Sequence, residues 1–140
     1  MSIALIVILV ILGVFLLMAL FIYNSLVVMR NKVKNGWSQI DVQLKKRYDL
    51  VPNLVETVKG YAKHEAGTLS KITELRNQAM QTKDIKAAMK TNDQLSKAIG
   101  GLLNVVVENY PDLKASQNFL MLQEELSGIE NKIAYARQYY

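Results

Sequence analysis

Apolar residues follow two patterns along this chain of 140 residues. Residues 3–23 form an unbroken apolar run with no charged or amide side chain, no proline and no histidine. A helix of that length, rising about 1.5 Å per residue, spans a hydrocarbon core of about 30 Å. Beyond residue 30, apolar side chains recur every three or four positions, which is typical of amphipathic helices. The pattern predicts an all-α protein, in which an N-terminal transmembrane helix continues into a long antiparallel helical bundle.

The apolar run has the features of an uncleaved signal-anchor. No basic residue precedes it, and Phe21, Ile22 and Tyr23 are too bulky for a signal-peptide cleavage site. The chain has no cysteine, so a lipoprotein anchor is excluded. These features predict that the run stays in the membrane.

The distribution of basic residues predicts the orientation of the chain. All 17 Lys and Arg side chains follow residue 29. Positively charged segments stay on the cytoplasmic side of a membrane. We therefore expect a short extracytoplasmic N-terminus (1–2), a span through the inner, cytoplasmic membrane (3–23) and a cytoplasmic domain (24–140).

The second half of the chain contains two apolar stripes of helical spacing, separated by a helix start at Pro111 and Asp112. They predict helices over 84–110 and 112–140. The first stripe consists of Ile85, Ala88, Asn92, Leu95, Ile99, Leu102 and Val106, and the second of Phe119, Leu122, Leu126, Ile129, Ile133, Ala136 and Tyr140. In the first helix we expect the Gly100–Gly101 pair to permit close helix packing, whereas a strand at 105–107 would lack a partner strand.

The stripe nearest the membrane keeps one heptad phase on both sides of Pro52. It consists of Val33, Trp37, Ile40, Leu44, Val51, Leu54, Val58 and Tyr61, and Arg47 is its only lapse. A turn at Pro52 would not require matching phases. The match favours one helix over 24–82, kinked at the proline, and hence a bundle of three long helices. The alternative is a turn at Asp49–Pro52, which would give four helices.

A helix over 24–82 would be longer than the two helices that follow it. Its membrane-proximal part would then have no partner within the chain, and exposed apolar stripes usually mark an interface. This predicts a homo-oligomer whose copies meet through Val33, Trp37, Ile40 and Leu44. The alternative is that further residues after Tyr140 cover the stripe.

Basic side chains cluster just after the span. Such charges are attracted to anionic lipid headgroups, each by about 1 kcal/mol near the surface. The candidate surface for lipid headgroups or a protein partner consists of Arg30, Lys32, Lys34, Asp41, Lys45, Lys46 and Arg47. The alternative is a solvated face with intrahelical pairs such as Asp41 with Lys45.

The residues needed for catalysis are missing from the sequence. Without cysteine there is no thiol nucleophile, and His64 is the only histidine, so the His-Glu-x-x-His pattern of zinc proteases does not occur. No glycine-rich phosphate loop is present. We therefore expect no catalytic, cofactor-binding or metal-binding residues, and a protein that is not an enzyme.

The net charge of +5 and pI near 9.4 raise the question of nucleic-acid binding. The excess positive charge lies beside the membrane, however, and no DNA-binding or RNA-binding motif occurs. We expect no nucleic-acid partner.

Several segments resemble the LemA family closely and in order along the chain. They are Tyr23–Val27, Arg30–Val33, Asn35–Arg47, Asp49–Glu56, Val58–Ala62 with His64 and Glu65, Glu108–Ala115, and Ile129–Ala134 with Ala136 and Arg137. The block Trp37–Leu44 (WSQIDVQL) is the most specific. Gly36 stands where the family commonly has Ala, and family members usually continue for some tens of residues beyond the position of Tyr140.

The resemblance implies a bacterial membrane protein with one N-terminal span, an outside-to-inside orientation and a long antiparallel helical domain. It assigns no catalytic residues and no established activity. Together with the predicted interface, it suggests a non-catalytic scaffold or assembly protein that associates with itself. The alternative is an adaptor that presents its bundle to a membrane-associated enzyme, such as a protease, or to an envelope-remodelling partner.

Overall fold

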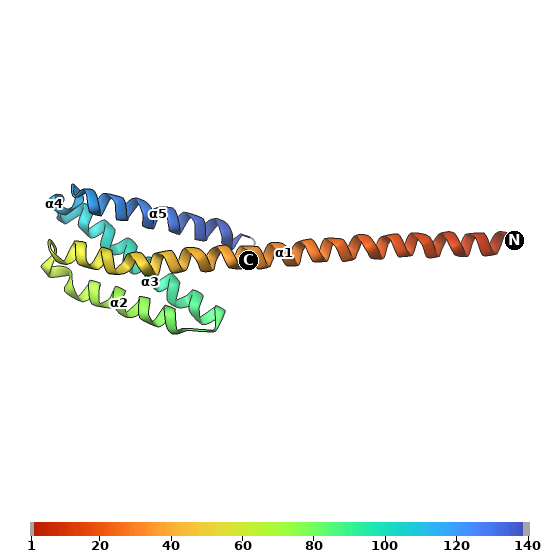
Figure 1. Ribbon diagram of the computed structural model, residues 1–140, viewed down its shortest axis with the longest axis horizontal. Helices are drawn as coiled ribbons and strands as arrows, with labels where there is room; N and C mark the ends of the chain where they lie inside the picture. Colours follow the sequence, from red (N-terminus) through yellow and green to blue (C-terminus); the bar gives the residue numbers. More distant parts are fainter. Residues whose placement is uncertain (1, 139–140) are drawn as a thin grey trace.

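The chain is helical almost throughout (Figure 1). The structure, a computed structural model, describes residues 2–138. Its elements are α1 (Ile3–Lys59), a 3₁₀ turn η1 (Lys63–Glu65), α2 (Ala66–Gln81), α3 (Ile85–Asn109), the single-turn α4 (Pro111–Lys114) and α5 (Gln117–Arg137). Within residues 2–138 there is no strand, so the predicted all-α class is confirmed.

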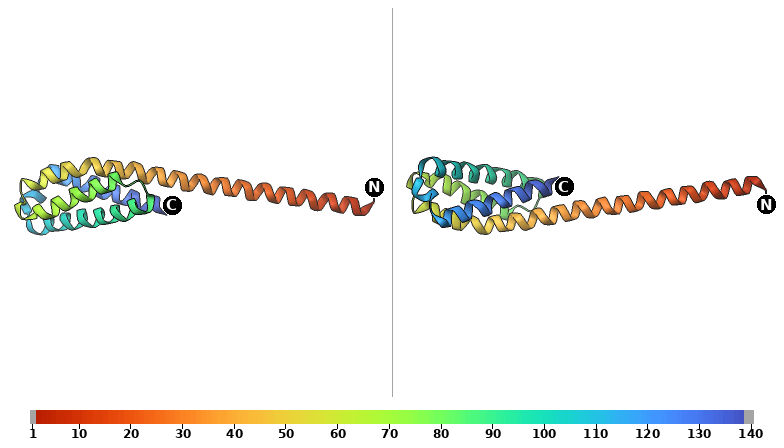
Figure 2. Two further views of the ribbon diagram at one scale, coloured as in Figure 1. Left: turned by 90° about the horizontal axis from the view of Figure 1, so that it is seen from below. Right: turned by 90° about the horizontal axis from the view of Figure 1, so that it is seen from above.

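The C-terminal part of α1 packs with α2, α3 and α5 in a four-helix bundle in which successive helices run in opposite directions (Figures 1 and 2). The N-terminal part of α1 extends alone from one end of the bundle. We call this the basal end; the α2–α3 turn and the C-terminal end of α5 also lie there. The α1–α2 turn and α4 lie at the opposite, distal end.

α1 contains the predicted membrane span. It is long and apolar enough to cross a bilayer, by length and composition, and the apolar side chains of residues 3–23 are exposed along the chain. Within residues 2–138 these side chains face no other helix, which is consistent with a segment that crosses a membrane.

The predicted helix over 24–82 is wrong at its C-terminal end, because the chain turns after Lys59. Gly60, Tyr61 and the turn η1 lead into α2, which has its own buried stripe of Leu69, Ile72, Leu75 and Ala79. The polar residues Glu65 and Thr68 fall where the heptad phase of α1 requires apolar ones. That interruption marks the turn, and the bundle has four long helices instead of the three favoured from the sequence.

The prediction that one helix continues through Pro52 is confirmed, and the alternative turn at Asp49–Pro52 is wrong. Proline has no N–H, so the carbonyl of Tyr48, four residues earlier, loses its helical partner. Arg76 of α2 replaces that partner, since its Nε donates a hydrogen bond to the Tyr48 carbonyl at 2.6 Å. The neighbouring helix thus satisfies the carbonyl that the proline leaves open.

The two C-terminal stripes form much of the core, as predicted. Asn92 through Val106 on α3 and Phe119 through Ala136 on α5 are buried at the predicted positions, whereas Tyr140 lies outside the described residues. The first two positions predicted for the α3 stripe are not buried, because Ile85 is exposed and Ala88 is half-buried at the start of the helix. The expected close packing at Gly100–Gly101 is wrong, because a Cβ atom at either glycine would meet nothing within 4 Å.

The prediction that Trp37, Ile40 and Leu44 face no partner within the chain is also wrong. Ile40 is 1% exposed, Leu44 is buried and Trp37 packs against the core. The reason is the turn after Lys59, which brings α2 back alongside α1, together with the return of α5 along its other side. Of the four predicted interface residues only Val33 stays exposed, at 45%.

Candidate functional site

A layer of polar side chains crosses the middle of the apolar core. We call it the polar layer; its members are Arg47 and Tyr48 of α1, Asn92 and Ser96 of α3, and Glu130 of α5.

Arg47 is the centre of the polar layer and is only 2% exposed. Its Nη1 donates hydrogen bonds to the Ser96 hydroxyl and to Oε2 of Glu130, the latter at 2.9 Å. Its Nη2 donates to the side-chain oxygen of Asn92 at 2.9 Å and to the backbone carbonyl of Asn92 at 3.2 Å. The Nε atom has no hydrogen-bond partner within the described chain. Arg47 therefore joins three helices through one guanidinium group.

Asn92 connects the guanidinium to the Tyr48 hydroxyl. That hydroxyl donates to Asn92 Oδ1 at 3.1 Å and accepts from Asn92 Nδ2 at 2.9 Å. The same Nδ2 also donates to the carbonyl of Ala88 at 2.9 Å. The amide therefore has partners for both of its polar atoms, which buried polar groups require.

Burial and neighbouring charges shift the pKa values of Arg47 and Tyr48 in opposite directions. Burial lowers the pKa of the Arg47 guanidinium from its ordinary value, and the Glu130 carboxylate acts to raise it. Burial raises the pKa of the Tyr48 hydroxyl, while the hydrogen bond with Asn92 and the charge of Arg47 lower it. Arginine stays protonated in proteins, so the layer holds a buried cation paired with a carboxylate that is 53% exposed.

The polar layer contradicts the prediction that Arg47 belongs to a surface for lipids or partners. Arg47 interrupts one apolar stripe and Asn92 is a polar member of another. In the structure these two side chains form a hydrogen bond with each other. This contact could have been predicted from the sequence by matching the polar residues that interrupt different apolar stripes. Ser96 and Glu130 lie outside the stripes and gave no such signal. Polar groups buried in this way can fix the register of packed helices.

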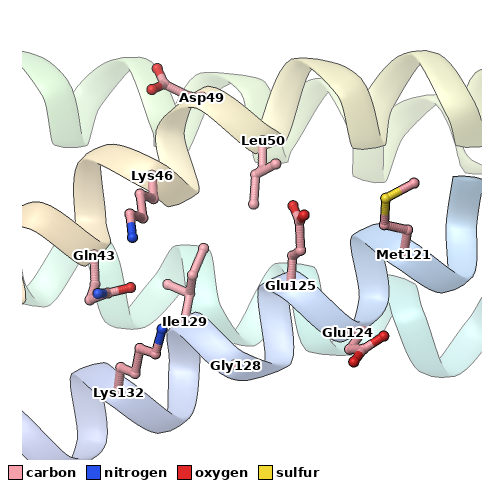
Figure 3. Close-up of a pocket in the computed structure, with 10 residues that line it drawn as sticks. All are labelled: Gln43, Lys46, Asp49, Leu50, Met121, Glu124, Glu125, Gly128, Ile129 and Lys132. Carbon is pink, nitrogen blue, oxygen red and sulfur yellow. The ribbon is translucent and has the colours of Figure 1, made fainter.

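An open groove lies between α1 and α5 along the bundle (Figure 3). Its volume is about 710 Å³, and its lining residues are Gln43, Lys46, Asp49, Leu50, Met121, Glu124, Glu125, Gly128, Ile129 and Lys132. We call it the α1–α5 groove. Leu50 and Ile129 point into it from opposite sides and give it an apolar floor.

The charged side chains of the α1–α5 groove differ between its two ends. Lys46 and Lys132 point toward one another across the basal part, next to Gln43, and Glu125 points toward α1 further along (Figure 3). Among the described residues, none of these three charged side chains has an ion-pair partner within 4.0 Å. Within the part of the chain that the structure describes, the Oε1 atom of Gln43 is buried without a hydrogen-bond partner. The groove thus combines apolar contact area with polar groups that a ligand could pair.

The remaining basic residues selected from the sequence are not gathered into one surface. Arg30, Lys32 and Lys34 are exposed on the uncovered part of α1. Lys45 pairs with Asp41 at 3.0 Å, as the alternative interpretation expected, and Lys46 lines the α1–α5 groove.

His64 is exposed in the turn η1, away from the polar layer and the groove. Among residues 2–138 no group of three or more His, Asp or Glu side chains is placed to hold a metal ion.

Comparison with known proteins decides the family. The LemA family model matches residues 36–140, which is most of the chain. The chain belongs to the LemA family. A curated relative, protein LemA of Metamycoplasma hominis, is 33% identical over 111 residues, which cover 79% of this chain and 50% of the relative.

The LemA match covers the whole bundle together with Gly36, where α1 enters it. The polar layer, the α1–α5 groove and the Pro52–Arg76 contact therefore all lie within the LemA region. The LemA family is not a known enzyme family. The chain spans about half the length of the LemA relative, so the activity of the longer protein is a matter for proposal.

Proposed function

We propose that this protein is a membrane-anchored adaptor whose bundle binds a partner protein in the α1–α5 groove. The observation that carries the proposal is that one chain closes its own core but leaves this groove open. The predicted self-association stripe is packed inside the bundle except for Val33, which removes the main reason for preferring a self-assembling scaffold.

The groove has the features of a site for an amphipathic helix. Such helices lay an apolar stripe into a groove between two others, with anchors three or four residues apart. Leu50, Ile129 and Met121 offer the apolar contacts. Lys46 and Lys132 favour an acidic side chain on the bound helix at the basal part, and Glu125 favours a basic one further along.

The anchor determines where such a partner would be found. We propose that α1 crosses the inner, cytoplasmic membrane with its N-terminus outside, because the basic residues Arg30, Lys32 and Lys34 directly follow the apolar segment. The partner would then be a cytoplasmic protein or the cytoplasmic part of a membrane protein, such as a membrane-associated protease.

A site-specific photo-crosslinker tests this proposal in intact membranes. Placed at Met121, which is exposed beside the groove, it should give one discrete adduct with another protein. Gly128→Phe should abolish the adduct, because there is open space around Gly128 and a bulky side chain there would occupy the groove. The matched control is Gly101→Phe, which adds the same bulk at an equally open position of α3 and should leave the adduct unchanged.

The other outcomes contradict the adaptor proposal. An adduct of twice 15.8 kDa would identify a second copy as the occupant and support the scaffold function instead. Absence of any adduct in membranes that contain the folded protein would exclude a stable partner in the groove.

A further inference from the structure

The net charge of the bundle is concentrated at its basal end. Residues 30–36 of α1 and 82–86 around the α2–α3 turn contain five basic side chains and one acidic one, Asp84, so their net charge is 5 − 1 = +4, compared with +5 for the whole chain. The basic residues are Arg30, Lys32, Lys34, Lys83 and Lys86, and all five are exposed. Arg137, at the end of α5, pairs with Asp93 at 2.7 Å.

The distal end serves as an internal comparison. Residues 59–65 and 108–114 contain three basic and three acidic side chains, so their net charge is 3 − 3 = 0. The positive charge is therefore a property of the end that faces the membrane and not of helix ends in general.

The length of free helix places the basal end close to the bilayer. Leu26 through Met29 are apolar and exposed, and no part of the bundle covers them. Apart from Asn24 and Ser25, the exposed part of α1 therefore stays apolar from Ile3 to Met29. From Met29 to Trp37, whose side chain packs against the core, the helix rises about 12 Å. The headgroup layer occupies about 5–8 Å of that distance, so the basal charges lie within about one Debye length of the lipid surface at physiological salt.

The apolar segment over 3–29 is also longer than the hydrocarbon core. It rises about 40 Å, compared with a core of about 30 Å. Tilting of α1 would accommodate the excess, and it would lower one side of the basal end toward the headgroups.

Side chains suited to a membrane interface line the basal end next to the lysines. A groove of about 280 Å³ lies between α1 and the α2–α3 turn; Trp37, Met80 and Ile85 line it together with Lys83. Met80 and Ile85 are exposed. Tryptophan and lysine are enriched where proteins meet headgroups, because each combines an apolar body with a polar end.

We propose that the basal end of the bundle docks on the anionic headgroups of the bilayer that α1 spans. Lys83 and Lys86 of the α2–α3 turn supply the contact together with Arg30, Lys32 and Lys34 of α1. The bundle is then held against the membrane instead of rotating freely on its helix. This contact does not involve the α1–α5 groove, so it stands or fails separately from the adaptor function.

The single tryptophan makes the contact measurable in the full-length protein. Trp37 fluorescence is recorded in vesicles of phosphatidylcholine, and in vesicles in which about one third of the lipid is phosphatidylglycerol, each with a nitroxide quencher on the headgroup. We expect at least twofold stronger quenching in the anionic vesicles, reversed by high salt because exposed charges are screened. Equal quenching in the two kinds of vesicle would overturn the proposal.

Two charge variants separate a specific contact from general attraction. Lys83→Gln with Lys86→Gln should remove the additional quenching. Lys63→Gln with Lys114→Gln removes the same charge from the distal end and should leave it unchanged. Equal effects of the two pairs would show that net charge, and not the basal end, draws the bundle to the membrane.

A second probe detects the same contact without tryptophan. The chain has no cysteine, so Gln81→Cys gives a unique labelling site at the exposed end of α2. A spin label there should become less accessible to a water-soluble relaxation agent in the anionic vesicles. Unchanged accessibility would contradict docking through the α2–α3 turn.

Discussion

The two parts of α1 share one continuous helix but have different partners. Residues 3–35 are exposed along their length, whereas residues 36–59 are buried on the side that faces α2 and α5. The first part begins with side chains that are apolar all round, as in a helix that crosses a membrane. The second has a single apolar stripe, because water remains on its outer side. Helix formation is common to both, and the distribution of apolar side chains determines what each part packs against.

The two parts of α1 should differ most in how the loss of a leucine side chain changes the free energy of unfolding. Leu54→Ala should lower the free energy of unfolding of the bundle by about 3 kcal/mol, since Leu54 is fully buried and its removal leaves a cavity. Leu16→Ala, in the exposed apolar part, should leave that free energy unchanged. Urea unfolding in detergent micelles, followed by Trp37 fluorescence, measures both. Similar losses in the two variants would mean that the span and the bundle unfold as one unit.

Two arginines on α1 test the polar layer in the same way. Arg47→Ala should lower the free energy of unfolding by about 2 kcal/mol, because Asn92 and Ser96 lose a buried partner. The loss should be less than for a fully buried pair, since the Glu130 carboxylate keeps contact with water. Arg30→Ala, on the exposed part, is the control and should have no effect on unfolding. If the Arg47→Ala protein is as stable as the parent, the polar layer sets the register of the packed helices without adding to the free energy of unfolding.

The contact between Arg76 and the carbonyl of Tyr48 can be isolated with a double-mutant cycle. Arg76→Ala should cost about 1 kcal/mol, because it leaves the carbonyl without a donor. In a Pro52→Ala background the new N–H of residue 52 can bond to that carbonyl, so the same Arg76→Ala change should cost clearly less. Thermal unfolding of the four proteins gives the coupling. Equal costs in both backgrounds would mean that Arg76 acts through something other than the proline.

The smallest expected effect is on the pH dependence of stability. The pKa of Tyr48 is raised by burial above 10.0 in the folded protein, so above pH 10 the unfolded chain binds fewer protons than the folded one. Its contribution to stability is therefore complete below pH 10 and is lost as the pH rises toward the folded pKa. The free energy of unfolding should fall more steeply with pH in the parent than in Tyr48→Phe. Parallel slopes from pH 9 to 11 would contradict the shift.

Much of the fold follows from the spacing of apolar residues, but the turn after Lys59 was not predicted. The stripes of α3 and α5 and the continuity of α1 through Pro52 were predicted correctly. The heptad phase carried the predicted helix past the turn, because phase alone does not distinguish one helix from two that follow each other. Because the turn after Lys59 was missed, Trp37, Ile40 and Leu44 were wrongly expected to form an uncovered stripe.

The polar layer was harder to predict for a different reason. Its hydrogen bonds join residues that are distant in sequence, such as Arg47 and Glu130, and local spacing carries no information about them. The α1–α5 groove likewise depends on which helices become neighbours. Its lysines, Lys46 and Lys132, are ordinary exposed residues when each helix is considered alone.

The contact that bridges Pro52 also sets an order of events during synthesis. The ribosome makes α1 before α2, so the Tyr48 carbonyl emerges without a donor until Arg76 has been made and α2 has folded back. The longest helix of the described residues is therefore completed by the one that follows it, which must fold back before the Tyr48 carbonyl has a side-chain donor.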